Sequence, residues 1–266
     1  MPMQISISNA IKGESSSGGG SSFENLYSFE FDGNTDYIES SSPYTVLAGD
    51  SQATFSFWFK LQKDSNAQYP LSCYDIANAR FIFGIRFQRT SPTDVRVWFY
   101  LNTATNNNRT FANLGSLNAD GQWHHLMIGM DLTRPNYQET NFYLDGVPFT
   151  QNGYTASSII TSFTGFLSIG NRANTFSEYY GGHIDEVAIW SGQDLSSDVA
   201  TIYNGGVPND LNDNGLTAPT TWYRMGDAAT HNGREWELTD QGSAGINVLS
   251  QTLPAPPTAP STDVPT

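Results

Sequence analysis

Short segments that alternate apolar and polar residues and are rich in Phe, Trp and Tyr follow one another through most of the chain. They are YSFEFDG (27–33), ATFSFWFKL (53–61), RFIFGIRF (80–87), VRVWFYL (95–101), WHHLMIGMDL (123–132), TNFYLDGVPF (140–149), GFLSIG (165–170) and HIDEVAIW (183–190). Each is bounded by Gly, Asn, Asp or Pro, which favour turns, and a period of two is typical of a half-buried β-strand. The pattern predicts an all-β fold, with two antiparallel sheets packed as a jelly-roll sandwich.

Turn and cap residues indicate how some of these strands connect. The pair Asp145-Gly146 predicts a tight hairpin, because both turn positions need positive φ. Residues 89–94, with Pro92, predict a second hairpin between two aromatic strands. One short helix is expected in SSDVATIYNGG, beginning at Ser caps at 196–197 and ending at Gly205.

Composition divides the chain into four parts. Residues 1–25 hold a short alternating arm, MQISISNAI, and a Gly/Ser-rich tether, GESSSGGGSS. Such a tether is flexible because it has nothing to bury. The sandwich is expected over 26–206. Residues 207–253 contain too few aliphatic side chains for a core of their own, so we expect them to pack on the sandwich. Residues 254–266 form a Pro-rich tail, expected to be extended and exposed.

Charge and cysteine content exclude several classes of partner and site. Lys and Arg total 12 against 26 Asp and Glu, giving a net charge of -14. That sign repels phosphate backbones, so we expect no nucleic-acid partner. Cys73 is the single cysteine, which excludes an intrachain disulfide and a thiolate metal cluster. No apolar run is long enough to span a bilayer, and residues 1–20 lack the apolar region of a secretory signal.

An aromatic sheet face is the best ligand-binding candidate. In 95–101, alternation places Arg96, Trp98 and Tyr100 on the side away from the core. On the neighbouring strand Arg86 points outward, while the side chains expected to point inward are Phe81, Phe83, Ile85 and Phe87. Sugars stack their C–H faces on aromatic rings and accept hydrogen bonds at the rim, so this face is a candidate glycan platform. The alternative is that the C-terminal segment or a neighbouring subunit covers it.

The order of several segments resembles the laminin G-like, concanavalin A-like lectin domains. The matching segments are FEFDGNTDYIE (29–39), ATFSFWFKL (53–61), DGQWHHLMIGMD (120–131), NFYLDGVPF (141–149), FLSIGNRA (166–173) and GGHIDEVAIWSGQDLSSDVATIYNGG (181–206). The resemblance implies a concanavalin A-like sandwich over roughly 26–206.

That resemblance raises the question of catalysis, because the same fold houses glycoside hydrolases, which use two carboxylates. The glucanases of this fold carry them on one strand, in a pattern like Glu-Ile-Asp-x-Glu. Here the corresponding residues are His183, Asp185 and Val187. Asp185 and Glu186 are adjacent, so we expect them to point to opposite faces of a strand. We therefore predict a noncatalytic protein, with the alternative of a hydrolase whose acids come from loops.

The resemblance also implies a structural calcium ion near the end of the sandwich. Its ligands would be Asp32 and Asp185, assisted by Asp36 or a nearby backbone carbonyl. Calcium takes six to eight oxygen ligands, which carboxylates and loop carbonyls supply. The alternative is that Asp32-Gly33 is a plain turn and that Asp185 accepts hydrogen bonds from backbone.

A second resemblance concerns the role of the whole chain. The arm, the Gly/Ser spacer, the sandwich and the segments VPNDL, TWYRMGD and LTDQGS are similar to virion proteins of phages, especially marine ones. This implies a head fibre, decoration or tail-associated adhesin at the virion surface, anchored to virion proteins by the arm and forming a homo-oligomer. Host-surface glycans would be its ligands. The alternatives are a purely structural decoration protein and an extracellular carbohydrate-binding module.

Overall fold

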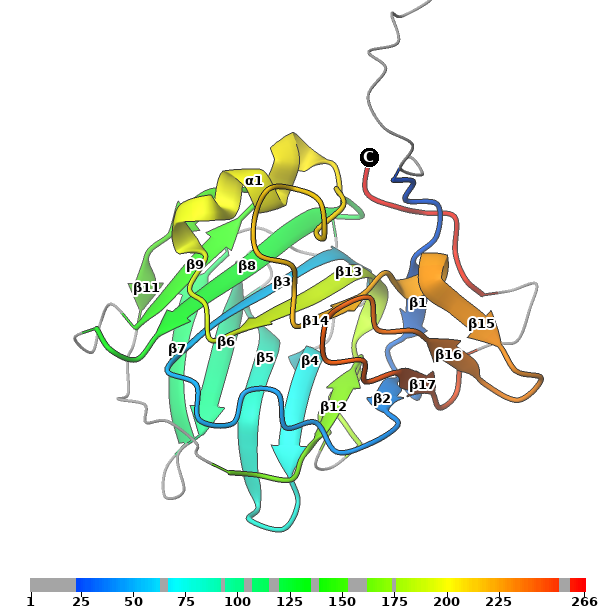
Figure 1. Cartoon of the computed structure of the whole chain (residues 1–266), viewed down its shortest axis with the longest axis horizontal. Coiled ribbons are helices and arrows are strands. Elements are labelled where there is room, and N and C mark those ends of the chain that lie inside the picture. Colours follow the sequence, from blue (N-terminus) through cyan, green and yellow to red (C-terminus); the bar gives the residue numbers. More distant parts are fainter. Residues whose placement is uncertain are drawn as a thin grey trace, which may run out of the picture.

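The computed structural model describes residues 23–62, 67–91, 94–102, 107–114, 120–134, 139–152, 162–173, 176–253 and 259–266. Within these ranges the strands form two antiparallel sheets that pack face to face (Figure 1). The predicted all-β sandwich is therefore confirmed. Residues 1–22, which hold the predicted arm and Gly/Ser tether, and residues 254–258 of the predicted Pro-rich tail lie outside the described residues.

The smaller sheet has seven strands. In spatial order they are β1 (Phe29–Asp32), β13 (Gly181–Ser191), β3 (Gln52–Leu61), β8 (His124–Asp131), β9 (Thr140–Leu144) and β10 (Val147–Phe149), while β14 (Thr221–Tyr223) pairs with β13. The predicted hairpin between β9 and β10 is present. Its turn residues Asp145 and Gly146 have φ of 51° and 75°, the left-handed values that this turn requires.

The larger sheet has ten strands. In spatial order they are β11 (Gln151–Asn152), β7 (Asn107–Asn113), β6 (Asp94–Asn102), β5 (Arg80–Ser91), β4 (Ala67–Asp75), β12 (Phe166–Ile169), β2 (Ile38–Ser40), β17 (Val248–Ser250), β16 (Trp236–Leu238) and β15 (Ala229–His231). The predicted hairpin between β5 and β6 is present, with Ser91 opposite Asp94. Residues 207–253 add β14 to one sheet and β15, β16 and β17 to the other, so they pack on the sandwich.

The core lies between the sheets and consists mainly of aromatic rings. Phe55 of β3 lies 4.8 Å, centroid to centroid, from Phe83 of β5, and Phe59 lies 4.8 Å from Phe87. These contacts join the two layers, since β3 and β5 belong to different sheets. Offset aromatic pairs at this separation add to the energy of burying their surface. The alternation of β3 and β5 therefore fixes which faces meet.

The predicted helix is present but shorter than expected. A 3-10 turn, η2 (Ser196–Asp198), leads into α1 (Val199–Tyr203), which ends at Asn204 in the left-handed conformation and is followed by η3 (Asn204–Gly206). The prediction of Ser caps is wrong, because Ser196 Oγ donates to Asp194 Oδ1 instead of capping the helix. A further 3-10 turn, η4 (Met225–Ala228), follows β14. In Figure 1, α1 lies over β8 and β9, on the outer face of the smaller sheet.

Two β-bulges overturn predictions made from strict alternation. In β5, Phe83 pairs with Cys73 but Phe81 pairs with Tyr74, so one residue is extra on β5. Because an extra residue shifts the alternation, Phe81 lies on the outer face and not in the core. In β13, Asp185 pairs with Trp58 and Ala188 with Ser56, so Glu186 and Val187 face one residue of β3.

The end of the Pro-rich tail also differs from expectation. We predicted an exposed segment, but Ala259 is buried and Ser261 forms a β-bridge with Ser28, next to β1. The tail is held because its backbone and Asp263 find hydrogen-bond partners on the sandwich.

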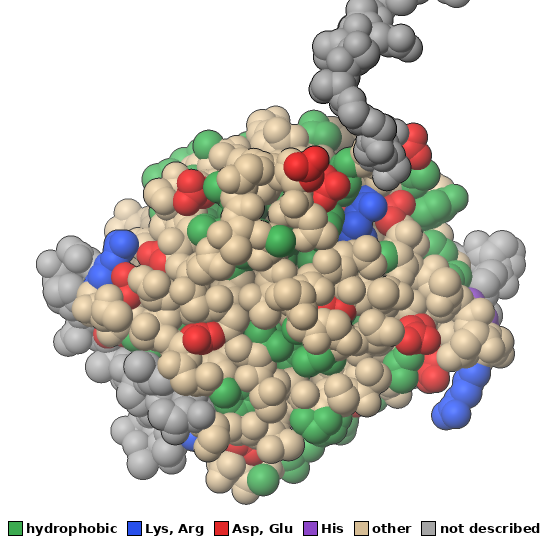
Figure 2. Space-filling model, in the orientation of Figure 1, with side chains coloured by type: hydrophobic (Ala, Val, Ile, Leu, Met, Phe, Trp, Pro, Cys, Tyr) green, Lys and Arg blue, Asp and Glu red, His purple; other side chains and the backbone are tan. Residues whose placement is uncertain are grey.

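The surface is sparsely charged on the side shown in Figure 2. Acidic side chains are scattered over this view, and uncharged polar side chains and backbone make up most of it. The net charge of -14 is therefore not gathered into one acidic patch on this face.

Candidate functional site

The outer face of the larger sheet brings together three of the four residues predicted to bind ligand. Trp98 and Tyr100 lie two residues apart on β6, with ring centroids 6.4 Å apart and planes inclined by 27°. Arg86 of β5 is the cross-strand partner of Trp98, and its Nη1 lies 3.4 Å from the Tyr100 hydroxyl. Directly opposed residues of antiparallel strands project to the same face, which explains why these three side chains meet.

Further aromatic residues join this cluster, and alternation alone does not reveal them. Tyr69 of β4 stacks on Phe81, with centroids 5.6 Å apart and planes inclined by 4°. Phe81 in turn lies 5.8 Å from Tyr100 and 5.1 Å from Tyr74. The bulge in β5 turns Phe81 outward, and a register shift in β4 after Gln68 accompanies Tyr69. We call Tyr69, Tyr74, Phe81, Trp98 and Tyr100 the aromatic face.

Gly84 makes room for the aromatic face. It lies opposite Tyr100 on β5, and a Cβ added there would come within 3.2 Å of Phe81 Cδ1 and 3.3 Å of Tyr69 Cε1. A side chain at this position would therefore push against the stacked rings. The glycine that interrupts RFIFGIRF is explained by this close approach.

Charged side chains border the aromatic face. Glu178 accepts hydrogen bonds from Arg86 Nη2 at 3.0 Å and from Arg172 Nη1 at 3.2 Å. The Arg172 guanidinium also lies 5.4 Å from the centroid of Phe81, a cation–π distance. Burial by itself lowers the pKa of the Arg86 guanidinium. The neighbouring Tyr100 and Glu178 together have the larger effect, so the pKa is raised. Arg86 is therefore a fixed positive charge at this face.

The fourth predicted residue, Arg96, lies on the same side of β6 but is held elsewhere. Its Nε donates to Asn113 Oδ1 at 3.0 Å. Gln88, which is not one of the four predicted residues, joins Trp98 to Arg86. Its Oε1 accepts hydrogen bonds from Trp98 Nε1 at 2.7 Å and from Arg86 Nη1 at 3.4 Å. Gln88 thus fixes the indole ring against the guanidinium.

The aromatic face is only partly open. Tyr69 and Phe81 are 2% and 6% exposed, and Tyr100 is 9% exposed, whereas Trp98 is half-buried. Arg172 and Glu178 reach over the buried end from the segment that follows β12, and Tyr69 N donates to Glu178 O at 3.0 Å. Strands β15–β17 of the C-terminal segment lie toward the other end of this sheet, so they do not cover the face. Tyr74 and Trp98 are the half-buried members of the aromatic face, and Arg86 and Gln88 lie beside Trp98.

The two carboxylates of β13 form a different arrangement from the one predicted. Asp185 pairs with Trp58, whose ring stacks on Tyr203 on the outer face, and Glu186 lines a cavity with Trp58. Both acids therefore lie on the outer face of the smaller sheet, and the prediction that they point to opposite faces is wrong. The bulge is the cause, since Glu186 takes a φ of 49° and the alternation shifts by one residue.

Both carboxylates are buried and occupied by protein partners. Asp185 is 0% and Glu186 3% exposed. Asn25 Nδ2 donates to Asp185 at 3.0 Å, while Trp222 Nε1 and Arg224 Nε donate to Glu186 at 2.6 and 3.2 Å. Burial raises the pKa of Glu186 to about 7, despite the opposing effect of Arg224. Burial and the neighbouring Glu186 also raise the pKa of Asp185 well above its usual range.

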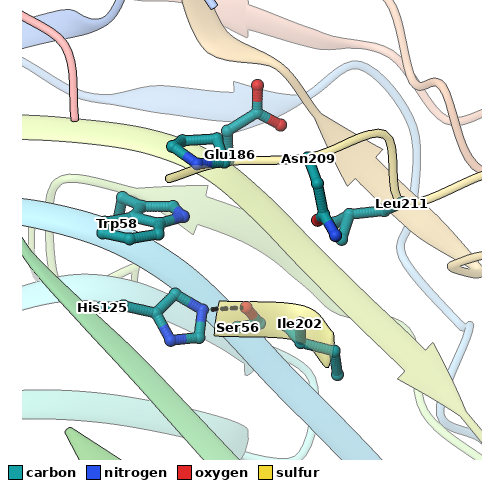
Figure 3. A pocket seen from close by; sticks show the side chains of 8 residues that line it. Ser56, Trp58, His125, Glu186, Ile202, Asn209 and Leu211 are labelled. Carbon is teal, nitrogen blue, oxygen red and sulfur yellow. Dashed lines mark hydrogen bonds between the residues drawn. The ribbon is translucent and has the colours of Figure 1, made fainter. Parts of the chain in front are cut away.

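A small cavity lies beside Glu186 (Figure 3). Ser56 Oγ and His125 Nε2 lie 2.7 Å apart within it, an arrangement that the sequence does not reveal because β3 and β8 bring the residues together. Burial lowers the pKa of His125 to about 4, so the imidazole is neutral near pH 7. The cavity volume is about 10 Å³, room for about one water molecule and far too little for a sugar ring. Its lining residues are Ser56, Trp58, His125, Glu186, Ile202, Pro208, Asn209 and Leu211.

The three predicted calcium ligands are not brought together. Asp32 lies opposite Gly181 on β13, four residues from Asp185, which corresponds to roughly 13 Å along a strand. Asp32 Oδ1 accepts hydrogen bonds from the backbone of Asn34, Thr35 and Asp36, as a turn residue does. Among the described residues no group of three or more His, Cys, Asp or Glu side chains could hold a metal ion. The set Asp32, Asp36 and Asp185 therefore does not fit one calcium ion.

The fold defines a two-sheet antiparallel β-sandwich of the concanavalin A-like type. Residues 32–200, more than half of the chain, match the laminin G-type family described as the concanavalin A-like lectin/glucanases superfamily. The chain belongs to this superfamily. No curated protein matches the sequence.

Solved structures support the fold. A native heptameric SAP-like pentraxin from Limulus polyphemus is 17% identical, with a TM-score of 0.54, and the match covers 67% of this chain and 82% of that one. A putative carbohydrate binding protein from Bacteroides ovatus is 15% identical, also with a TM-score of 0.54. That match covers 90% of this chain and 62% of the other. None of the helices in the described ranges is long and apolar enough to cross a membrane.

Proposed function

We propose that this chain is a noncatalytic protein of a virion surface that binds glycans through the outer face of its larger sheet. It would act as a head fibre, decoration or tail-associated adhesin. The observation that carries the glycan-binding part is the half-buried Trp98 with Arg86 and Gln88 beside it. An indole face packs against sugar C–H groups, while a guanidinium and an amide hydrogen-bond hydroxyls at the rim.

Membership of a lectin and glucanase superfamily makes carbohydrate the favoured ligand class. The buried acid pair supports binding over hydrolysis. A glycosidase needs two carboxyl groups that flank the scissile bond, but Asp185 and Glu186 are buried and bonded to protein groups. The adjacent cavity, about 10 Å³ in volume, is too small for a sugar. A substrate group that bound Glu186 would have to displace the hydrogen bonds from Trp222 and Arg224.

The virion setting rests on the sequence. The alternating arm MQISISNAI and the Gly/Ser tether precede the sandwich, and an alternating segment can add as an edge strand to a partner. The flexible tether would let the sandwich extend away from its anchor. Many weak glycan sites on one particle would then act together through effective concentration. An extracellular carbohydrate-binding module would use the same face without the anchor.

Glycan binding is tested by comparing the wild-type chain with Trp98→Ala on a glycan array. We expect binding to at least one glycan class and a loss of about tenfold or more in affinity for the variant, because an aromatic anchor commonly carries this much. Tyr27→Ala is the matched control, since Tyr27 is 39% exposed and precedes β1 in the other sheet. Equal binding by wild type and Trp98→Ala would refute the proposed site.

A purely structural role is the second candidate, favoured by the burial of Tyr69 and Phe81. It predicts no glycan binding by the wild-type chain. The anchoring role has its own test, which is a chain without residues 1–22. We expect this truncation to bind glycans normally but to be missing from assembled particles, and its incorporation would show that the arm is not the anchor.

A further inference from the structure

The last described residues of the chain form a short strand-like contact beside β1. Ser28 N donates to Ser261 O and Ser261 N donates to Ser28 O, both at 2.9 Å. The Ser28 hydroxyl donates to Asp263 O at 2.6 Å. Figure 1 shows the C-terminal segment running beside the chain that leads into β1. Three backbone groups of 261–263 are thus recognised by one residue of the sandwich.

The side chain of Asp263 is recognised as well. Lys60 Nζ lies 2.6 Å from Oδ2, and Trp123 Nε1 donates to Oδ1 at 2.8 Å. His183 Nε2 lies 3.8 Å from Oδ2. Partial burial opposes ionisation, but the hydrogen bonds from Lys60 and Trp123 prevail and hold the pKa of Asp263 below its usual range. Each carboxylate oxygen therefore has its own donor.

These donors come from separate parts of the smaller sheet. Lys60 is on β3, His183 is on β13 and Trp123 immediately precedes β8. In a chain with 12 Lys and Arg against 26 acids, the convergence of an ammonium group, an imidazole and an indole N–H on one carboxylate marks a built site. We call Ser28, Lys60, Trp123 and His183 the tail site.

The contacts distinguish a peptide from a simple anion. An isolated carboxylate would satisfy Lys60 and Trp123 but not the paired backbone groups of Ser28. An extended Ser-x-Asp segment satisfies both, in the manner of a strand added to a sheet edge. The segment on this chain that has this pattern and is seen in the site is Ser261-Thr262-Asp263.

We propose that the tail site is a peptide-binding site and that residues 261–263 of a second copy of this chain occupy it in exchange for the chain's own tail. Site and tail are both present on every copy, and exchange of an identical segment uses the same contacts, so its cost is low. The inference rests on the proposed function in one respect. Copies crowded on a particle reach the effective concentrations, about millimolar, at which exchange competes with the internal contact.

Two full-length variants test this exchange. In Asp263→Lys and in Lys60→Glu the chain's own tail is repelled from its own site. When the two are mixed, the tail of Lys60→Glu still carries Asp263, and the site of Asp263→Lys still carries Lys60. We expect tagged Asp263→Lys to retain at least tenfold more untagged Lys60→Glu than untagged Asp263→Lys. Equal retention would overturn the proposal, because any unrelated self-association is common to both mixtures.

Competition identifies what the site recognises. We expect free peptide Ala-Pro-Ser-Thr-Asp-Val-Pro-Thr, residues 259–266, to release the retained chain, and the same peptide with Asn in place of Asp263 to fail. Release by sodium glucuronate at equal concentration would overturn the peptide site in favour of an acidic-sugar site. If charge reversal impairs folding, the neutral pair Lys60→Gln and Asp263→Asn gives the same comparison. None of these measurements involves Trp98, so their failure leaves the test of glycan binding at Trp98 unaffected.

Discussion

The buried carboxylate Glu186 predicts an unusual dependence of stability on pH. Its pKa is about 7 in the folded protein, against an ordinary value of 4.5. Between these values the folded chain keeps a proton that the unfolded chain has lost, so raising the pH favours unfolding. The folded and unfolded pKa values of Glu186 differ by roughly 2.5. At about 1.4 kcal/mol for a pKa difference of one, this corresponds to about 3 kcal/mol in the free energy of unfolding. This stability should be present below pH 4.5 and lost as the pH rises to 7.

The substitution Glu186→Gln removes the ionisable group while keeping an oxygen that can accept from Trp222 Nε1. We expect the variant to gain about 3 kcal/mol relative to wild type as the pH rises from 4.5 to above 7. Urea unfolding across this range measures the difference. Glu30→Gln is the control for the loss of a carboxyl group, because the Glu30 side chain is 58% exposed. The same pH slope in Glu186→Gln as in the wild type would refute the reasoning.

Two further predictions follow from the geometry. Excess EDTA should leave the melting temperature unchanged, because Asp32 and Asp36 are satisfied by local hydrogen bonds and Asp185 lies elsewhere; a decrease in melting temperature would indicate a metal ion that these residues do not explain. Gly84→Ala should lower the free energy of unfolding by about 1–3 kcal/mol, since its Cβ would crowd Phe81 and Tyr69. Unfolding in urea checks this value, and a change below about 0.5 kcal/mol would mean that the rings move aside easily.

The strands with clear alternation could be predicted from sequence because burial of one sheet face imposes the period of two. Strands β3, β6 and β9 are examples. Strand β4 could not be predicted in the same way. Its sequence AQYPLSCYD lacks clear alternation, and Pro70 lies where the pairing with β5 shifts register. Proline is tolerated at such an irregularity because no ladder hydrogen bond is required of it there.

The candidate site could be predicted in part. Arg86, Trp98 and Tyr100 follow from the regular pairing of β5 with β6. Phe81 and Glu186 could not be assigned to the correct faces, because each lies at a bulge whose extra residue is set by the neighbouring strand. The contacts of Asp263 with Lys60 and Trp123 span 203 and 140 residues, and no local pattern indicates a partner so distant.

The most direct test of the central claim is to observe Trp98 while a glycan binds. The chain has six tryptophans, and the indole N–H resonance missing from the spectrum of Trp98→Ala identifies Trp98. On titration with a glycan selected from the array, we expect this resonance to shift in a saturable way while that of the fully buried Trp190 stays in place. Saturable binding with an unmoved Trp98 resonance would contradict the account and place the ligand elsewhere on the sandwich.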